Sequence, residues 1–442
     1  MSSTRPRKAV LANGLVLLTV TREDSPIVAA LLMYRAGSLY EPVGKTGLAH
    51  LTEHMMFRGT PTRPQGWIDR LTGHLGGTNN AMTTCDHALY YFVLPSEHWA
   101  TPLEIEADRM FHCEFGPEAF ETEKRVAVEE RMMLDDDPET LVYEAVDALA
   151  FDSHPYRYPV VGLMRDIKGL TPDDLQGFYA DRYRPEKAVL AVVGNVEHER
   201  VLAEVEKLSS AAGPLPARAS ARVGDDSADP DAASSDAGAS ARVACGDDVS
   251  ARFEDPPPTE PRRSVLRGLS PSPQAVLAFR APAAAHEDTP ALELLAALLS
   301  SGRSARMYTR LVDDLGMATE VSTSKIPQVD PGLFYLSASL HSGVSPEECE
   351  DEILNLVSGL VESGVSEDEL SRALNLTRVD LMLGRETCLG QAGSAAFWES
   401  LGDWHLGEEH ETRLARVTAA DIRRVASTYL NPAGRSSAWL VP

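Results

Sequence analysis

The sequence has no apolar run close to the roughly 18 residues that a membrane-spanning helix requires. Its start also has no apolar core followed by a small-residue cleavage site, so we expect no cleaved signal peptide. Basic residues are scarce: 41 lysines and arginines against 66 acidic residues leave a formal net charge of −25. Such a field repels phosphate backbones and anionic lipid headgroups. We therefore expect neither nucleic acid nor a membrane as a partner.

Cysteines are few, and none of them forms a CxxC pair. The five are Cys85, Cys113, Cys245, Cys349 and Cys388. An odd number at wide spacing predicts neither a disulfide framework nor a thiolate zinc site, so we expect a reducing, cytoplasmic location. Nucleotide-binding loops are missing too, because no GxGxxG or GxxxxGK[ST] run stands at a strand-to-helix junction.

One long stretch lacks the apolar residues that a core needs. Between residues 214 and 261 the chain is rich in alanine, serine, aspartate, glycine and proline, which cannot bury enough surface to offset chain entropy. The whole chain has ordinary globular composition, with 43% hydrophobic and 24% charged residues. We therefore predict a flexible linker at 214–261 between two domains, 1–213 and 262–442.

The two predicted domains share a short internal repeat. Thr171 and Asp174 recur as Thr418 and Asp421 at an offset of 247 residues, and an apolar run follows in both copies. Threonine at this position is typical of a helix N-cap. Strand-like and helix-like runs interleave without strict alternation, which favours an α+β fold over a doubly wound parallel sheet. We expect two homologous α/β-layer domains that arose by duplication.

The segment with the clearest chemistry is His50-Leu-Thr-Glu53-His54. On a helix, positions i, i+3 and i+4 share a face, so these three side chains would project together. Two neutral imidazoles suit zinc, and a carboxylate that stays off the metal can polarise the attacking water. The competing interpretation is a solvated polar helix face, because such a pattern arises by chance in roughly 3 of 100 chains of this composition.

A catalytic zinc also needs a third protein ligand, and an acidic helical segment offers candidates. Glu123 and Glu130 are seven residues apart, or two helical turns, and share a face, whereas Glu129 is rotated by about 100°. Without the two histidines, this segment would be interpreted as an acidic solvated helix. The spacing leaves both Glu123 and Glu130 open as the third ligand.

Together these segments resemble the pitrilysin superfamily of zinc metallopeptidases, the inverzincins with HxxEH order, and within it the mitochondrial-processing-peptidase-like branch. Members carry a ligand glutamate some seventy-odd residues after the histidines, and Glu130 follows His54 by 76. The resemblance implies that His50, His54 and Glu130 bind one zinc ion per chain, while Glu53 and Glu123 serve catalysis. It also implies the LuxS/mitochondrial-processing-peptidase-like metallohydrolase fold, with zinc in the first domain and none in the second.

A second motif extends the resemblance. The run from Gly76 to Thr83 is similar to the family's GGxxNAxT, an edge strand that receives the substrate as an added strand. The match implies that Asn80 and Ala81 bind the backbone of a peptide or unfolded segment in extended conformation. We therefore expect a metalloendopeptidase to which folded proteins are resistant.

One part of the family pattern is missing. Complete relatives carry an arginine and, seven residues on, a tyrosine in the second domain, where this chain has Val312 and Thr319. This combination resembles the zinc-bearing subunit of two-subunit members, in which a homologous partner supplies the missing pair. We therefore expect a heterodimer, and the alternative is a single-chain enzyme with weaker transition-state stabilisation.

Two expectations concern the whole protein. A non-catalytic subunit of a larger assembly is the rival function, because the same fold serves as a structural core in respiratory complexes. Such subunits usually lose the ligand set, and this chain retains it. The predicted linker is long enough for the domains to open and close around a peptide, and shortening its Asp225 to Asp248 stretch should leave zinc binding intact.

Overall fold

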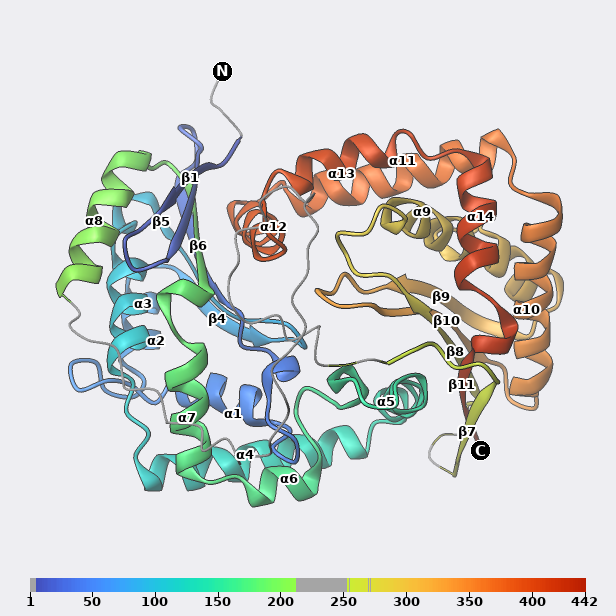
Figure 1. Cartoon of the computed structure of the whole chain (residues 1–442), viewed down its shortest axis with the longest axis horizontal. Helices are drawn as coiled ribbons and strands as arrows, with labels where there is room; N and C mark the ends of the chain where they lie inside the picture. Colours follow the sequence, from blue (N-terminus) through green and yellow to red (C-terminus); the bar gives the residue numbers. More distant parts are fainter. Residues whose placement is uncertain (1–4, 212–252, 254, 269, 271) are drawn as a thin grey trace, which may run out of the picture.

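Two mixed β-sheets, one in each half of the chain, form the framework of the computed structural model (Figure 1). The structure describes residues 5–211, 253, 255–268, 270 and 272–442, so most of the predicted linker lies outside the described residues. The strands are β1 (Arg7–Val10), β2 (Val16–Thr21), β3 (Ile27–Tyr34), β4 (Thr78–Thr83), β5 (Ala88–Pro95), β6 (Ala188–Gly194), β7 (Arg262–Arg267), β8 (Gln274–Ala281), β9 (Ala318–Lys325), β10 (Gly332–Leu340) and β11 (Ser436–Val441).

The first sheet has the strand order β1-β2-β6-β3-β5-β4. β2 and β6 run parallel, and the other neighbours are antiparallel. The apolar strand β6 is buried along its whole length, whereas the polar strand β4 alternates between exposed and half-buried residues. β4 stands at the end of the sheet, so within the described chain one of its sides has no neighbouring strand.

The second sheet, β7-β11-β8-β10-β9, repeats this arrangement without β1. β7 and β11 are parallel, as β2 and β6 are, and the remaining pairs are antiparallel. The repeat continues in α7 (Pro172–Arg182) and α14 (Ala419–Tyr429), which both begin at a capping box made by the predicted threonine and aspartate. The predicted α+β fold and both predicted helix caps are confirmed.

The other helices pack around the two sheets, and α1 lies between the β4–β5 edge and helices α4 and α7. Within the described residues, no helix is both long and apolar enough to cross a membrane. These helices are α1 (Leu48–Met55), α2 (Trp67–His74), α3 (Thr101–His112), α4 (Pro117–Asp135), α5 (Pro138–Ala150), α6 (Met164–Gly169), α8 (His198–Ala211), α9 (Thr289–Ser300), α10 (Pro346–Ser363), α11 (Glu367–Gly384), α12 (Cys388–Ser400) and α13 (Leu406–Leu414).

One helix from each half packs on the sheet of the other half (Figure 1). α5 buries Val142 and Val146 in a cluster with residues of the second sheet. α12 buries Ala392 and Ala396 in a cluster with residues of the first sheet. The strands of each sheet thus lie within one predicted domain, whereas two of the buried apolar clusters contain residues of both domains.

The end of the predicted linker contacts the first half. The carboxylate of Asp255 accepts hydrogen bonds from the backbone N–H groups of Asp152, Ser153 and His154, at 3.0, 2.6 and 2.7 Å. β7 begins seven residues later, at Arg262. This part of the 214–261 segment is therefore held in place by backbone donors.

A buried polar network joins the two halves. Asp86, next to β5, accepts hydrogen bonds from the Tyr156 hydroxyl and, at 3.0 Å, from the N–H of Val329 in the second half. The Tyr156 hydroxyl accepts the N–H of Asp330 at 3.2 Å, and His154 Nε2 lies 3.1 Å from Asp330 Oδ2. Burial is the main cause that raises the pKa of Asp86, to about 6.

Candidate metal centre

Helix α1 begins at a backbone conformation that favours glycine. Gly47 has a φ of +89°, and a Cβ there would lie 2.4 Å from the carbonyl oxygen of Val161. The N–H groups of Gly47 and Ala49 donate hydrogen bonds to the carboxylate of Glu41, at 3.2 and 2.7 Å. The carboxylate satisfies N–H groups that a helix leaves unpaired at its first turn, and so it fixes where α1 starts.

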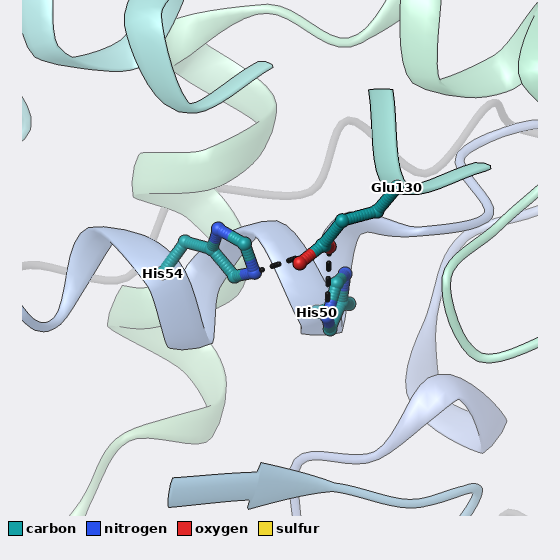
Figure 2. A group of neighbouring side chains, drawn as sticks. All are labelled: His50, His54 and Glu130. Atoms are coloured by element: carbon teal, nitrogen blue, oxygen red, sulfur yellow. Dashed lines mark ion pairs between the residues drawn. The ribbon is translucent and has the colours of Figure 1, made fainter. Parts of the chain in front are cut away.

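The polar face of α1 meets a carboxylate from α4 (Figure 2). Leucines and Met55 bury the opposite face of α1, which leaves His50, Glu53 and His54 on the side of α4. Glu130 Oε2 lies 3.6 Å from His50 Nε2 and 3.5 Å from His54 Nε2. The structure therefore brings together the two predicted histidines and Glu130, the glutamate that the family resemblance implies.

These three groups fit a zinc ion. One ligand atom from each residue lies within 4.8 Å of the others. Ligands about 2.0–2.1 Å from a tetrahedral zinc are about 3.4 Å apart, close to the separations of 3.5 and 3.6 Å observed between Glu130 and the histidines. Glu130 Oε2 is shielded from solvent and has no hydrogen-bond partner within the described residues. Two imidazoles and a carboxylate form a donor set that zinc prefers.

The protonation of His50 also suits a ligand. Burial, together with the neighbouring His54, lowers the pKa of His50 to about 4. The ring is therefore neutral near pH 7 and offers a lone pair. Its Nδ1 atom is buried and has no hydrogen-bond partner in the described part of the chain.

Glu53 lies beside this cluster and contacts the edge strand. Its Oε2 accepts a hydrogen bond of 2.5 Å from Thr83 Oγ1, at the end of β4. Burial raises the pKa of Glu53, while the hydrogen bond from Thr83 and the charge of His54 act in the opposite direction. A raised pKa suits a group that takes up a proton in one step and releases it in the next. The sequence motif includes Thr83, but only the fold reveals that it contacts Glu53.

Glu123 takes a different position from Glu130. Its Oε2 lies 2.9 Å from His54 Nδ1, the ring nitrogen that does not face Glu130, and its Oε1 contacts the guanidinium of Arg58. Glu129 is exposed. The structure thus separates the two open glutamates: Glu130 faces both histidines, and Glu123 supports one of them. Sequence reasoning missed Arg58, whose only signal is its position four residues after His54.

The two residues of the predicted substrate strand lie on β4. Asn80 pairs with Tyr91 of β5, and Ala81 pairs with Tyr90. Asn80 is exposed and accepts the N–H of Ala81 on its Oδ1 at 2.9 Å, while Ala81 packs against the core of the first half. Because the strand ends at Thr83, it runs along the sheet edge directly to Glu53.

Val312 and Thr319 occupy the second half. Val312 lies in a π-helical segment (Tyr308–Asp314) and packs against the core around the second sheet. Thr319 is exposed on β9 and donates a hydrogen bond of 3.1 Å to the carbonyl of Ser339. Arg306, six residues before Val312, is held by the carboxylate of Glu369 at 2.7 and 3.0 Å.

Known proteins resemble the chain over most of its length. It is 25% identical over 440 residues to the zinc protease PqqE of Helicobacter pylori, which covers 98% of this chain and 92% of that protein. It is 26% identical over 437 residues to the uncharacterized zinc protease Rv2782c of Mycobacterium tuberculosis, covering 96% and 91%. The crystal structure of a protease from Helicobacter pylori shares the fold, with a TM-score of 0.87, 24% identity and 99% coverage of both chains.

Two family models divide the chain between them. Residues 16–162, which contain every candidate ligand, match the model described as insulinase (peptidase family M16). Residues 169–377 match the model described as the peptidase M16 inactive domain. The expected resemblance is thereby confirmed at the level of the family, whereas the branch within it stays a prediction. The chain belongs to the peptidase M16 (insulinase) family.

Proposed function

We propose that this chain is a zinc-dependent endopeptidase. The observation that carries the proposal is the convergence of His50 Nε2, His54 Nε2 and Glu130 Oε2, with the carboxylate of Glu53 beside them. Relatives named zinc proteases, which match nearly the full chain, support it. The match to an inactive domain covers residues 169–377 and so leaves out all four side chains.

Each residue of the centre has one role in the proposed mechanism. His50, His54 and Glu130 would hold the ion. When bound, zinc supplies a Lewis acid that lowers the pKa of water and stabilises negative charge on the carbonyl oxygen. Glu53 takes a proton from the attacking water and passes it to the leaving amine. Glu123 supports catalysis through its contact with His54.

The open side of β4 is the proposed substrate site. A peptide that adds to this edge as a further strand would bind through backbone hydrogen bonds near Asn80 and Ala81. Because the strand ends where Thr83 contacts Glu53, such a peptide would pass the proposed general base. Extended peptides should be cleaved, and a folded globular protein cut as fast as its unfolded form would contradict this part of the proposal.

We also propose that the chain is the zinc-bearing subunit of a heterodimer in the mitochondrial-processing-peptidase-like branch. Neither a valine at 312 nor a threonine at 319 can supply a cation or a phenol to the substrate carbonyl. A homologous chain that keeps these two groups and lacks HxxEH should raise the activity on mixing. Full activity of a monomer or homodimer, measured with its size-exclusion mass, would refute the heterodimer.

Metal content and peptide turnover test the function together. The wild type should bind about one zinc per chain and cleave an unfolded peptide. Glu53→Gln should keep the zinc and lose about 100- to 10,000-fold in turnover, since it removes a general base. A full zinc complement without turnover, even with the homologous partner added, would instead favour a non-catalytic role in a larger assembly. Failure of the wild type to bind zinc would reject the metal centre.

A further inference from the structure

We propose that Arg58 is a positioning residue of the metal centre, which holds the Glu123 carboxylate so that this group fixes the ring of His54 for metal binding. The inference rests on the proposed zinc peptidase function and extends it to a residue outside the ligand set. It comes from contacts that link His54 of α1, Glu123 of α4 and Arg58 in the turn that follows α1.

The Glu123 carboxylate has a partner on each side. His54 and Arg58 are four residues apart, and a hydrogen bond of 3.0 Å from the N–H of Arg58 to the carbonyl of Met55 closes the turn after α1. The Glu123 carboxylate inserts between the two side chains: Oε2 lies 2.9 Å from His54 Nδ1, and Oε1 contacts Nε and Nη2 of Arg58. The side chains of Arg58, Glu123 and His54 are only 17%, 10% and 15% exposed.

The contact with Glu123 selects one tautomer of His54. A carboxylate only accepts hydrogen bonds, so Nδ1 of the ring must carry the hydrogen. In the neutral ring the lone pair then resides on Nε2, the atom that lies 3.5 Å from Glu130 Oε2. His50 has no comparable support, because its Nδ1 has no partner within the described residues. Of the two histidines, His54 is therefore the one whose ring is oriented by a hydrogen bond to a neighbouring side chain.

Arg58 determines whether Glu123 can do this. A glutamate side chain has three rotatable bonds, and within the described residues His54 and Arg58 are the polar partners of its carboxylate. A guanidinium presents its donors in a rigid plane, so it limits carboxylate rotation more than a flexible ammonium does. Removing the guanidinium would free the carboxylate to turn away from His54 Nδ1, and the ring would lose both its orientation and its tautomer preference.

The test compares Arg58→Met with the matched control Arg63→Met. Arg63 also follows α1 and pairs with a shielded carboxylate, that of Asp108 at 2.7 Å, and its side chain is 19% exposed, but it contacts no candidate ligand. Zinc affinity is measured by competition with a chromogenic chelator. Arg58→Met should bind zinc about 10- to 100-fold more weakly than wild type, the usual cost of losing support behind a ligand. Arg63→Met should bind it as the wild type does.

Two further measurements separate positioning from general damage to the fold. In the zinc-free protein, ¹⁵N shifts of His54, assigned with His54→Gln, should indicate hydrogen on Nδ1 in the wild type and a mixture of tautomers in Arg58→Met. In a Glu123→Gln background, Arg58→Met should cost little further affinity, because both changes remove the same support. Arg58→Lys should recover part of the loss. If circular dichroism reveals that Arg58→Met fails to fold, Arg58→Gln takes its place with the same expected loss.

The outcomes distinguish this inference from the proposed function. Equal zinc affinity and an equal His54 tautomer in wild type and Arg58→Met would overturn the role of Arg58 and leave the zinc centre standing. Full additivity with Glu123→Gln would also overturn it. A wild type that binds no zinc would reject the proposed function, while the ¹⁵N measurement on the zinc-free chain would still decide whether Arg58 controls the ring.

Discussion

Replacing Thr83 by valine removes a single hydroxyl that joins the edge strand to the proposed general base. Valine keeps the branched shape at Cβ, so β4 and its pairing with β5 should persist. The change removes the 2.5 Å hydrogen bond to Glu53 Oε2, and within the described structure it touches no candidate metal ligand. Zinc content should therefore stay at the wild-type level.

The expected loss follows from the charge of the acceptor. A hydrogen bond to a charged group contributes about 1.5–3 kcal/mol, and about 1.4 kcal/mol corresponds to a factor of ten in rate. Thr83→Val should therefore lower kcat/KM about 10- to 100-fold. The bond from Thr83 also lowers the pKa of Glu53 against the larger effect of burial. Its loss raises this pKa, so the acidic limb of the kcat/KM profile should move to higher pH.

The assay is steady-state cleavage of an unfolded peptide across pH, with Thr78→Val as the control. Thr78 is an exposed residue at the other end of the same strand, so its replacement tests whether any threonine-to-valine change on β4 weakens substrate binding. A KM effect shared by both variants would reflect the strand, and a kcat effect confined to Thr83→Val would reflect the base. Equal kcat and equal pH profiles in the two variants would refute the positioning of Glu53 by Thr83.

Two more predictions concern the framework of the site. The pKa of Asp86 is raised to about 6, so the folded protein keeps this proton after the unfolded chain releases it, and wild-type stability should fall as the pH rises from about 4 through 6. In urea unfolding, the free energy of unfolding of Asp86→Asn relative to the wild type should rise by about 1 kcal/mol between pH 5 and pH 8. A difference between the two proteins that does not change with pH would contradict a buried charge at Asp86. Gly47→Ala should lower the unfolding temperature and zinc affinity, at a cost of about 2 kcal/mol or more, because it combines a positive φ with a clash at Val161. Gly44→Ala should cost about 1 kcal/mol, since Gly44 has a φ of +77° and open space around it, and equal losses in the two variants would refute the role of the clash.

Local features of this protein were predictable because their geometry depends on few neighbours. The spacing of His50, Glu53 and His54 places them on one face of any helix, whatever surrounds it. The same holds for Thr171 and Thr418, since an N-cap is formed by the residue and the first turn after it. Interleaved strand-like and helix-like runs were likewise sufficient for the α+β class.

Helical spacing alone left two glutamates open as the third group at the cluster, although the family resemblance pointed to Glu130. Glu123 and Glu130 share one face of α4, and helical spacing treats them alike. The way α4 is positioned against α1 places Glu130 against both histidines and Glu123 against the far ring nitrogen of His54. This relative position is determined by side-chain packing between two helices that are separated by more than sixty residues in sequence, which no local rule describes.

The contacts that support the site, and the packing of α5 and α12, also depend on the tertiary structure. Thr83, Arg58 and Glu41 are ordinary polar residues in the sequence, and each gains its role only where folding places it beside α1 or α4. α5 and α12 carry apolar faces, and each packs on the sheet of the other half. Sequence alone thus determined which residue types could build a zinc site and which local elements carry them. Only long-range packing decided which of those residues meet, because the free energy gained by burial depends on the apolar area removed from water and not on how far apart the residues lie in the sequence.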